Sequence, residues 1–410
     1  MHIISALIFF NLFGCSSKKT EIVHPQAERL PGIDEVDHVH DMSENNTDLL
    51  SKFSFLDSLN TIGTIGVQVE GIGEQTEVNS VYYYPRDSDR IDIDPNGNLY
   101  FLQYHTNSIV VYNRIGEYQY SIGRGGRGPG EFTALITFVF DEDYQTLYAL
   151  DENFKIEIFE LIEGQYKYKE TVFLKYRGVY DMCILNENLY LSGFALSKND
   201  TTNYESDYHR SHMHKVTPPI SRINLKTMEP ELHFGFEYRT EYGYGWHEGV
   251  LSQMRLSCNQ ASNTIVGYQI EFPYIFGYSP DGKLKWTSFF DNIKTAQYTE
   301  FTHPENGMTG LKHQTHEGRV YRKKPLPTFT FKHYEMVQLY LSSPIQRMGS
   351  FDPDLVVRKR DYHTFLLNTE NGELYRSDAY PLIKLIKDHT YITAKADTNT
   401  FEHSFYIHEL

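Results

Sequence analysis

The sequence predicts an all-β fold: a six-bladed β-propeller of four-stranded antiparallel blades. The chain holds 32 Tyr and 26 Phe, and aromatic residues favour strands. No long stretch repeats apolar residues at the i, i+3, i+4, i+7 spacing of an amphipathic helix. A unit of four short strands joined by tight turns recurs along the chain, as it does in propeller blades.

The unit is clearest in residues 90–122. Its four expected strands are "RIDID", "LYFLQ", "IVVY" and "EYQYSI". Turns rich in Asn and Gly separate the first pair and the second pair, because Gly supplies the positive φ that tight turns need. The same order of strands and turns is expected in residues 138–174, 179–236 and 253–288.

The turn before the fourth strand gives the strongest internal repeat. In four places a Gly precedes an alternating strand: "YNRIGEYQY" (112–120), "FELIEGQYKY" (159–168), "YSPDGKLKW" (278–286) and "LNTENGELY" (367–375). Each lies where a blade would turn from its third strand to its fourth. The repeat therefore indicates several copies of one unit.

The last two units are less regular. In residues 308–377, "RVYRKK" and "FTFKHYEMVQLYL" each look like one strand, and their order stays open. The sixth unit has only three strands: "PLIKLIK", "TYITAK" and "SFYIHEL". Because an open sheet edge invites aggregation, we expect a segment within 61–85 to close the ring. The candidates are "TIGVQV" (64–69) and "SVYYY" (80–84).

The densest glycine run is "SIGRGGRGPGEF", residues 121–132, which spells G-x-G-x-x-G. A dinucleotide fingerprint must follow a strand and open a helix. Here β-rich sequence follows the glycines, so we predict a tight crossing from one blade to the next. The residues concerned are Gly123, Gly125, Gly128, Pro129, Gly130, Glu131 and Phe132.

The crossing resembles the inter-blade signature of NHL-type, TolB-like six-bladed propellers. It is especially similar to the lipoprotein propellers of Bacteroidota, with their G-x-x-G-x-G-P-G-E-F/Y run, and "DPNGNLY" at 94–100 supports the likeness. The resemblance implies fold and location rather than activity. Some six-bladed relatives are calcium-dependent lactonases or zinc-dependent lyases, but no equivalent set of ligand residues is found in this sequence.

The N-terminus reads as an export signal. "IISALIFFNLF" is too short to span a bilayer but suits a signal-peptide core. The following Cys15 lies in "LFGC", which resembles the bacterial lipobox and implies lipidation, with an ordinary signal peptide as the alternative. We expect a signal peptide in 1–15, a flexible tether in 16–60 and the propeller in 61–410. No acidic run follows Cys15, which favours the outer membrane, facing the periplasm.

The charge and cysteine content limit the partners. A net charge of -16 argues against nucleic acid, and we expect a monomer. Besides Cys15 the chain has Cys183 and Cys258. An exported compartment permits a disulfide between them, but both lie in apolar, strand-like runs. We therefore expect two buried, unlinked cysteines.

Few residues suggest chemistry. His209, His212 and His214 lie in a polar insert, 196–219, where a solvated loop is favoured over a metal clamp. The segment "YRTEYGYGWHEG" (238–249) offers Tyr242, Tyr244, Trp246 and His247, either for ligand stacking or as a plug on the blades. No catalytic residue and no cofactor are predicted.

We therefore expect a membrane-anchored propeller that serves as a binding or scaffold protein, with an unknown peptide, protein or glycan as its ligand. The alternative is a metal-dependent hydrolase or lyase at the central tunnel, which would use calcium or zinc. In an up-and-down blade, the loop from second to third strand lies on the same face as the crossing to the next blade. The ligand is expected on this crossing face, near the third and fourth blades.

Overall fold

The structure is a computed structural model. It describes residues 21–22, 39–41, 60–65, 90–103, 106–174, 176–195, 218–237, 249, 252–270, 274–289, 297–302, 309–314, 322–342, 360–377, 383–387, 390–396 and 403–409.

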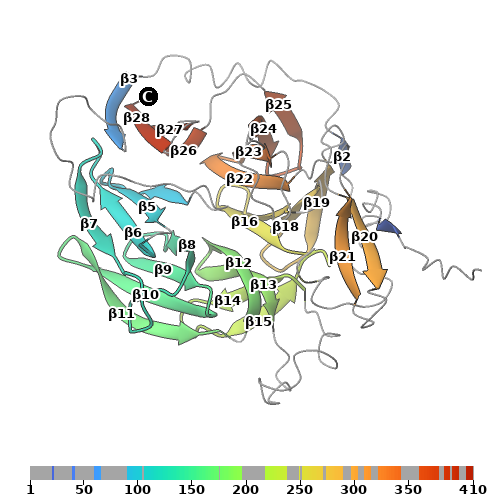
Figure 1. Cartoon of the computed structure of the whole chain (residues 1–410), viewed down its shortest axis with the longest axis horizontal. Helices are drawn as coiled ribbons and strands as arrows, with labels where there is room; N and C mark the ends of the chain where they lie inside the picture. The colour runs from blue at the N-terminus through green and yellow to red at the C-terminus, as the bar shows by residue number, and fades with distance from the viewer. Residues whose placement is uncertain are drawn as a thin grey trace, which may run out of the picture.

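The first four blades follow one another around the ring in chain order (Figure 1). Blade 1 holds β4 (Ile91–Ile93), β5 (Leu99–Gln103), β6 (Ser108–Tyr112) and β7 (Tyr118–Ile122). Blade 2 holds β8 (Leu135–Phe140), β9 (Thr146–Asp151), β10 (Lys155–Ile162) and β11 (Gln165–Phe173). Blade 3 holds β12 (Tyr176–Leu185), β13 (Asn188–Ala195), β14 (Ile220–Asn224) and β15 (Pro230–Phe234). Blade 4 holds β16 (Met254–Asn259), β17 (Thr264–Gln269), β18 (Tyr274–Tyr278) and β19 (Leu284–Phe289).

Two further blades complete the ring. Blade 5 holds β22 (Arg322–Phe331), β23 (Tyr334–Ser342), β24 (Arg360–Asn368) and β25 (Leu374–Ser377). Blade 6 holds β26 (Ile383–Lys387), β27 (Thr390–Ala396) and β28 (His403–Glu409). A single parallel pair, Phe329 with Ile386, links the inner strands of these two blades. The prediction of four-stranded antiparallel blades in a six-bladed ring is confirmed.

The repeated glycines lie where the sequence placed them. Gly116, Gly164, Gly282 and Gly372 each precede the fourth strand of a blade, and their φ angles lie between 78° and 89°. An L-residue with a side chain rarely adopts this conformation. The repeat in the sequence is therefore a repeat of one turn geometry.

The fifth blade corrects one prediction. The run "FTFKHYEMVQLYL" is a hairpin rather than a single strand, because β22 ends at Phe331 and β23 begins at Tyr334. Lys332 has a φ of 53°, so a residue without the usual turn chemistry makes this turn. Apolar residues on both sides concealed it in the sequence.

The N-terminal side of the chain closes the ring, as expected. β3 (Asn60–Ile65) pairs antiparallel with β28 and becomes the fourth strand of blade 6. It overlaps only the start of the candidate "TIGVQV"; the other candidate, residues 80–84, lies outside the described residues. β3 and the C-terminal strands β26 to β28 thus share one blade, in which the N-terminal side of the chain supplies the fourth strand.

Two shorter strands lie within the segment expected as a tether. β2 (Val39–Asp41) pairs parallel with β19, as a fifth strand on the outer edge of blade 4. β1 (Glu21–Ile22) pairs with β20 (Gln297–Thr302), which forms a hairpin with β21 (Thr309–Gln314) outside the six blades. The outer strand β19 is accordingly well covered: Trp286, Thr287 and Ser288 have no exposed surface.

The core lies between neighbouring blades. One cluster joins blades 1 and 2 through residues such as Tyr100, Phe138 and Phe159, and another joins blades 3 and 4 through Tyr190, Met254 and Phe276. Side chains alternate across each strand, so each sheet packs against a neighbour on both faces. This packing holds the inner strands β8, β12 and β16 close together around the axis.

Candidate functional site

The glycine-rich segment makes the step from blade 1 to blade 2. It runs from Ile122, the end of β7, to Leu135, the start of β8, without an intervening helix. Its backbone N–H groups already have acceptors within the chain. Gly125 donates to Thr106 O (3.0 Å), Gly126 to Phe132 O (2.9 Å), Gly128 to Glu131 Oε2 (2.8 Å) and Gly130 to Glu157 Oε2 (3.2 Å). The donors that would cradle a phosphate are therefore in use.

A buried ion pair holds this crossing in place. On β10, Lys155 Nζ lies 2.5 Å from Glu157 Oε1, and the side chains are 7% and 0% exposed. Lys155 also donates to the backbone oxygen of Glu131 at 2.6 Å, and Thr171 donates to Glu157 at 2.7 Å. Each buried charge has several partners, which is the condition under which burial is tolerated. The crossing is thus held by the Lys155–Glu157 pair below it and by the Arg124–Glu131 pair within it.

Most of the residues that sequence reasoning singled out lie outside the described residues. These are Cys15, His209, His212, His214, Tyr242, Tyr244, Trp246 and His247. For the insert and the aromatic crossing, the structure describes the points at which the chain leaves and rejoins the blades.

Both segments are attached at the same place on blades 3 and 4. The Phe194 ring, just before the insert, lies between Gly178 and Gly249. A β-carbon added to Gly178 would lie 2.5 Å from the Phe194 ring, and one added to Gly249 would lie 2.7 Å from it. At the other ends, Pro219 and Ile220 lie against Gly235. The insert and the aromatic crossing therefore begin and end side by side, on the crossing face.

Polar residues lie beneath this point, on the inner strands. Asp181 of β12 accepts hydrogen bonds from the backbone N–H of Met182 (2.9 Å) and of Leu256 (3.0 Å). Arg255 of β16 places Nη1 3.9 Å from Asp181 Oδ2 and its guanidinium 4.9 Å from the Tyr180 ring centroid. Gln253 donates to Gly178 O at 3.0 Å. Asp181 thus ties the inner strands of blades 3 and 4 together and holds a cation beside an aromatic ring.

A second buried carboxyl lies between blades 4 and 5. Glu335 of β23 has no exposed surface and accepts hydrogen bonds from Ser257 Oγ (2.8 Å) and from the Tyr268 hydroxyl. No cation among the described residues pairs with it. Burial raises the pKa of Glu335 to about 7, and the two donors oppose this rise.

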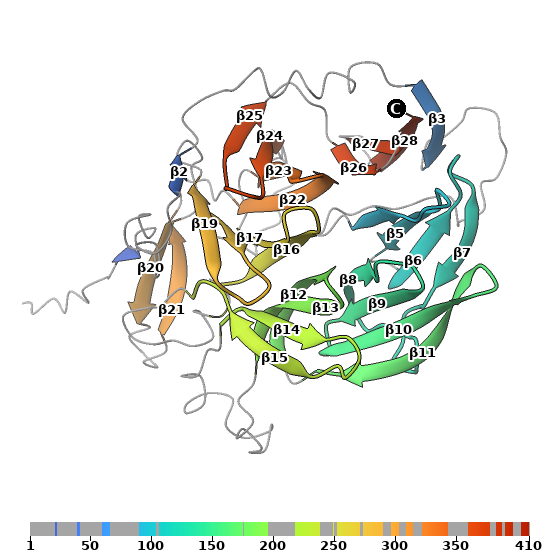
Figure 2. The same cartoon turned by 180° about the vertical axis from the view of Figure 1, so that it is seen from behind.

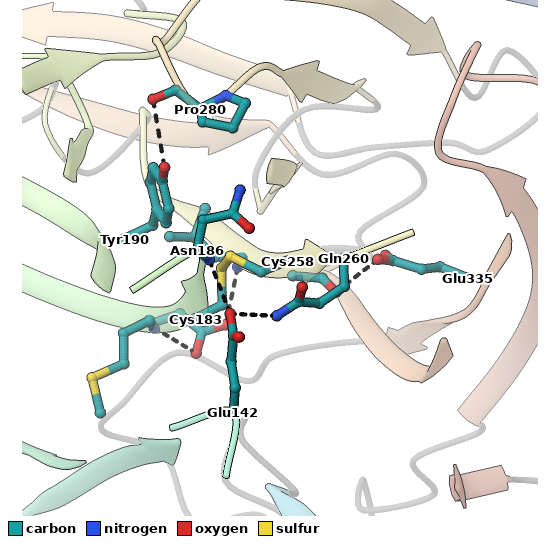
Figure 3. The surroundings of a disulfide bond; sticks show 12 residues. Glu142, Cys183, Asn186, Tyr190, Cys258, Gln260, Pro280 and Glu335 are labelled. Carbon is teal, nitrogen blue, oxygen red and sulfur yellow. Dashed lines mark hydrogen bonds between the residues drawn. A yellow bond between two sulfur atoms is a disulfide. The ribbon is translucent and has the colours of Figure 1, made fainter. Parts of the chain in front are cut away.

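The two remaining cysteines correct another prediction. Cys183 of β12 and Cys258 of β16 form a disulfide, with their Cα atoms 5.6 Å apart (Figure 3). They are not two separate buried thiols. Both lie on inner strands of adjacent blades and point into the same core cluster, and the closeness of these strands in space is a consequence of ring geometry. The sequence separation of 75 residues conceals it.

The face opposite the crossings is cross-linked by its turns. Glu142, between β8 and β9, accepts hydrogen bonds from Asn186 N (3.1 Å) and Gln260 Nε2 (2.6 Å), as Figure 3 shows beside the disulfide. Asn186 also donates to Asn263 Oδ1 at 2.7 Å. Short turns of blades 2, 3 and 4 are thus joined. Hydrogen bonds between blades therefore tie this face together, whereas the insert and the aromatic crossing are attached at the other face.

A groove of about 700 Å³ runs along the outer rim between blades 2 and 3. The outer strand β11 forms one wall and the turn from β14 to β15 forms the other, with Phe173, 75% exposed, at the edge. Lys169 on this wall pairs with Glu160 at 2.6 Å. Two buried residues, Tyr148 of β9 and Ile158 of β10, also line the groove.

The described residues offer neither a metal cluster nor a membrane-spanning helix. No group of three or more His, Cys, Asp or Glu side chains in this part of the chain is arranged to hold a metal ion. None of the described segments forms an apolar helix long enough to cross a bilayer.

Comparison with known proteins identifies the fold. A family model, DUF5128, described as a 6-bladed beta-propeller, matches residues 89–228, which cover blades 1 and 2 and most of blade 3. The chain is a six-bladed β-propeller. No curated protein matches it.

The chain is also similar to several solved structures. A Bacteroides fragilis protein described as exported has a TM-score of 0.46 and 11% identity, with 90% of this chain and 99% of that one covered. A member of the duf4221 family from Bacteroides vulgatus has a TM-score of 0.49 and 11% identity, with 86% and 98% covered. Virginiamycin B lyase from Staphylococcus aureus has a TM-score of 0.38 and 11% identity, with 78% and 94% covered.

Sequence reasoning missed the buried polar residues of this propeller. Asp181, Arg255 and Glu335 each interrupt an otherwise apolar strand, in "YDMCIL", "MRLSC" and "YEMV". A charged residue within such a run is seldom buried without a partner. That signal was present in the sequence, but the partners come from other blades.

Proposed function

We propose that this chain is an exported, lipid-anchored, NHL-type propeller that binds a peptide, protein or glycan on its crossing face, beside blades 3 and 4. The observation that carries the proposal is the position of Phe194. This one ring, between Gly178 and Gly249, marks where the insert and the aromatic crossing both meet the blades. Long segments on a rigid scaffold are where propellers and other folds carry binding residues.

The composition of these segments fits binding. Tyr242, Tyr244 and Trp246 are large rings with a polar edge, and such residues supply contact area at a low entropic cost. Their segment rejoins the fold at Gly249, a few residues before Arg255, which lies beside Tyr180. A ligand on this face would therefore meet aromatic surface, with the buried Arg255–Asp181 pair beneath it.

Export is supported by two independent features. The N-terminal apolar run and "LFGC" resemble a lipoprotein signal, and the Cys183–Cys258 disulfide belongs to an oxidising compartment. The lipobox resemblance implies lipidation at Cys15, and the lack of an acidic run after Cys15 favours an outer-membrane location facing the periplasm. The experiment is fractionation: a Cys15→Ser variant should leave the membrane fraction.

The binding site is tested with two defined libraries, a glycan array and a display library of random peptides. Wild type is compared with a variant in which Tyr242, Tyr244 and Trp246 are changed to Ala. A control variant changes three exposed rim residues, Tyr118, Tyr168 and Phe173, to Ala.

We expect the crossing-face variant to lose about tenfold or more in affinity, since one lost contact of about 1.4 kcal/mol has this effect. The rim variant should bind like wild type. Equal binding by all three proteins, or loss only in the rim variant, would place the site elsewhere. The absence of any binder in both libraries would argue against a peptide or glycan ligand.

A further inference from the structure

The N-terminal part of the chain contacts the propeller at successive points. Glu21 and Ile22 of β1 pair with Thr299 and Tyr298 of β20. Farther along, β2 pairs with β19, and β3 then closes blade 6. Figures 1 and 2 show β2, β20 and β21 on one side of the ring, with β7 and β11 on the opposite side. The first two contacts therefore lie on the same side of the molecule.

The first contact lies very close to the expected lipid anchor. A chain from Cys15 to Glu21 spans at most roughly 22 Å even when fully extended. A lipidated cysteine is fixed at the membrane surface because its acyl chains lie in the bilayer. β1 and its partner β20 must then lie within roughly 20 Å of the lipid headgroups.

The net charge and two lysines near the anchor fit this arrangement. The chain carries a net charge of -16, so an anionic leaflet repels the protein as a whole. Lys18 and Lys19, between Cys15 and β1, are positive charges in the segment nearest the lipid. Each such lysine contributes about 1 kcal/mol of attraction to an anionic surface.

We propose that the β20–β21 hairpin and the outer edge of blade 4 form the membrane-facing side of this protein, with blades 1 and 2 pointing away. The partner is a lipid surface. The inference rests on the proposed lipid anchor at Cys15. In this arrangement β1 limits the free tether to residues 16–20, and the propeller lies sideways near the bilayer instead of moving freely on a long tether.

The experiment uses the full-length lipidated protein in vesicles of phosphatidylethanolamine and phosphatidylglycerol that carry a headgroup quencher. The natural cysteines are occupied by lipid and by the disulfide in this arrangement, so one introduced cysteine takes a fluorophore. Thr302→Cys places the probe at the end of β20. Ile115→Cys places it in the β6–β7 turn of blade 1, where Ile115 is 51% exposed.

We expect the Thr302 probe to be quenched severalfold more strongly than the Ile115 probe. Equal quenching, or stronger quenching at Ile115, would overturn the orientation. Adding Cys15→Ser distinguishes the two proposals. Release of the protein from the vesicles supports the lipid anchor, and retention on them shows that the anchor itself is wrong.

A second variant tests the role of β1. Glu21→Pro with Ile22→Pro removes two backbone donors and prevents regular strand pairing. The control is Gln26→Pro with Ala27→Pro, which lie outside the strand and carry no charge. We expect the β1 variant to stay on the vesicles but to lose the difference between the two probes, while the control keeps it. An unchanged difference in the β1 variant would show that β1 does not set the orientation.

Discussion

Gly123 lies so close to the Phe132 ring that a β-carbon at position 123 would stand 2.2 Å from its Cε2 atom. Gly123 also has a φ of 68°, and Phe132 has no exposed surface. The crossing therefore depends on this position in two ways, through backbone conformation and through close packing. Its glycines serve the geometry of the step between blades.

Gly123→Ala should lower the free energy of unfolding by about 3 kcal/mol. The left-handed conformation costs a residue with a side chain about 1–2 kcal/mol, and overpacking against a fixed ring adds about 1–3 kcal/mol. Chemical denaturation monitored by fluorescence measures the change.

Gly164→Ala is the matched control. Gly164 has a φ of 78°, but no atom lies within 4 Å of an added β-carbon. This variant should lose only about 1 kcal/mol, the conformational cost alone. Equal losses in the two variants would show that the Phe132 contact has no energetic effect.

The blades were predictable because the information is local. Each Gly of the repeated turn and each short alternating run can be recognised within about ten residues. The hairpin at Lys332 could not be recognised in this way, because its turn contains no Gly, Asn or Asp. Closure by an N-terminal strand was also predictable, because a three-stranded last unit needs a partner.

The buried polar network was not predictable, because its partners are far apart in the sequence. Asp181 bonds to Leu256 on the next blade, and Glu335 bonds to Ser257 and Tyr268 on the preceding one. Only the ring brings these residues together. The same holds for Cys183 and Cys258, which look like independent core residues until β12 and β16 are seen side by side.

Removing the disulfide should lower the free energy of unfolding substantially. A cross-link over 75 residues restricts the unfolded chain by about 4 kcal/mol in the loop-entropy model. The comparison is between wild type and a Cys183→Ala, Cys258→Ala variant, by denaturant titration. A reductant should destabilise wild type and leave the variant unchanged; an equal response of both proteins would contradict the cross-link.

Ring closure is tested by shortening the chain. A protein that begins at Val67 lacks β3, and its five paired positions with β28 are lost. At about 1 kcal/mol for each net hydrogen bond, we expect a loss of about 3 kcal/mol or more and a lower melting temperature. A protein that begins at Asp48 also lacks β1 and β2 but keeps β3, and it should melt at a clearly higher temperature than the protein that begins at Val67. Similar melting of the two shortened proteins would exclude closure by β3.

The last prediction concerns Glu335 and pH. Its pKa rises from 4.5 to about 7 in the folded protein, mainly because burial disfavours the charged form. Between these values the unfolded chain has lost the proton and the folded chain still holds it. The contribution of Glu335 to the free energy of unfolding is therefore greatest below pH 4.5. It falls as the pH rises towards about 7 and no longer changes above that pH.

Glu335→Gln removes this dependence. The difference in unfolding free energy, wild type minus variant, should fall by about 3 kcal/mol from pH 4.5 to pH 7.5. Denaturant titrations at several pH values measure it, and taking the difference cancels the other titrating groups. Glu163→Gln, at an exposed turn, is the control and should show no such trend. A flat difference for Glu335→Gln would show that folding does not raise the pKa of this carboxyl, and that the acid between blades 4 and 5 is ionised at neutral pH.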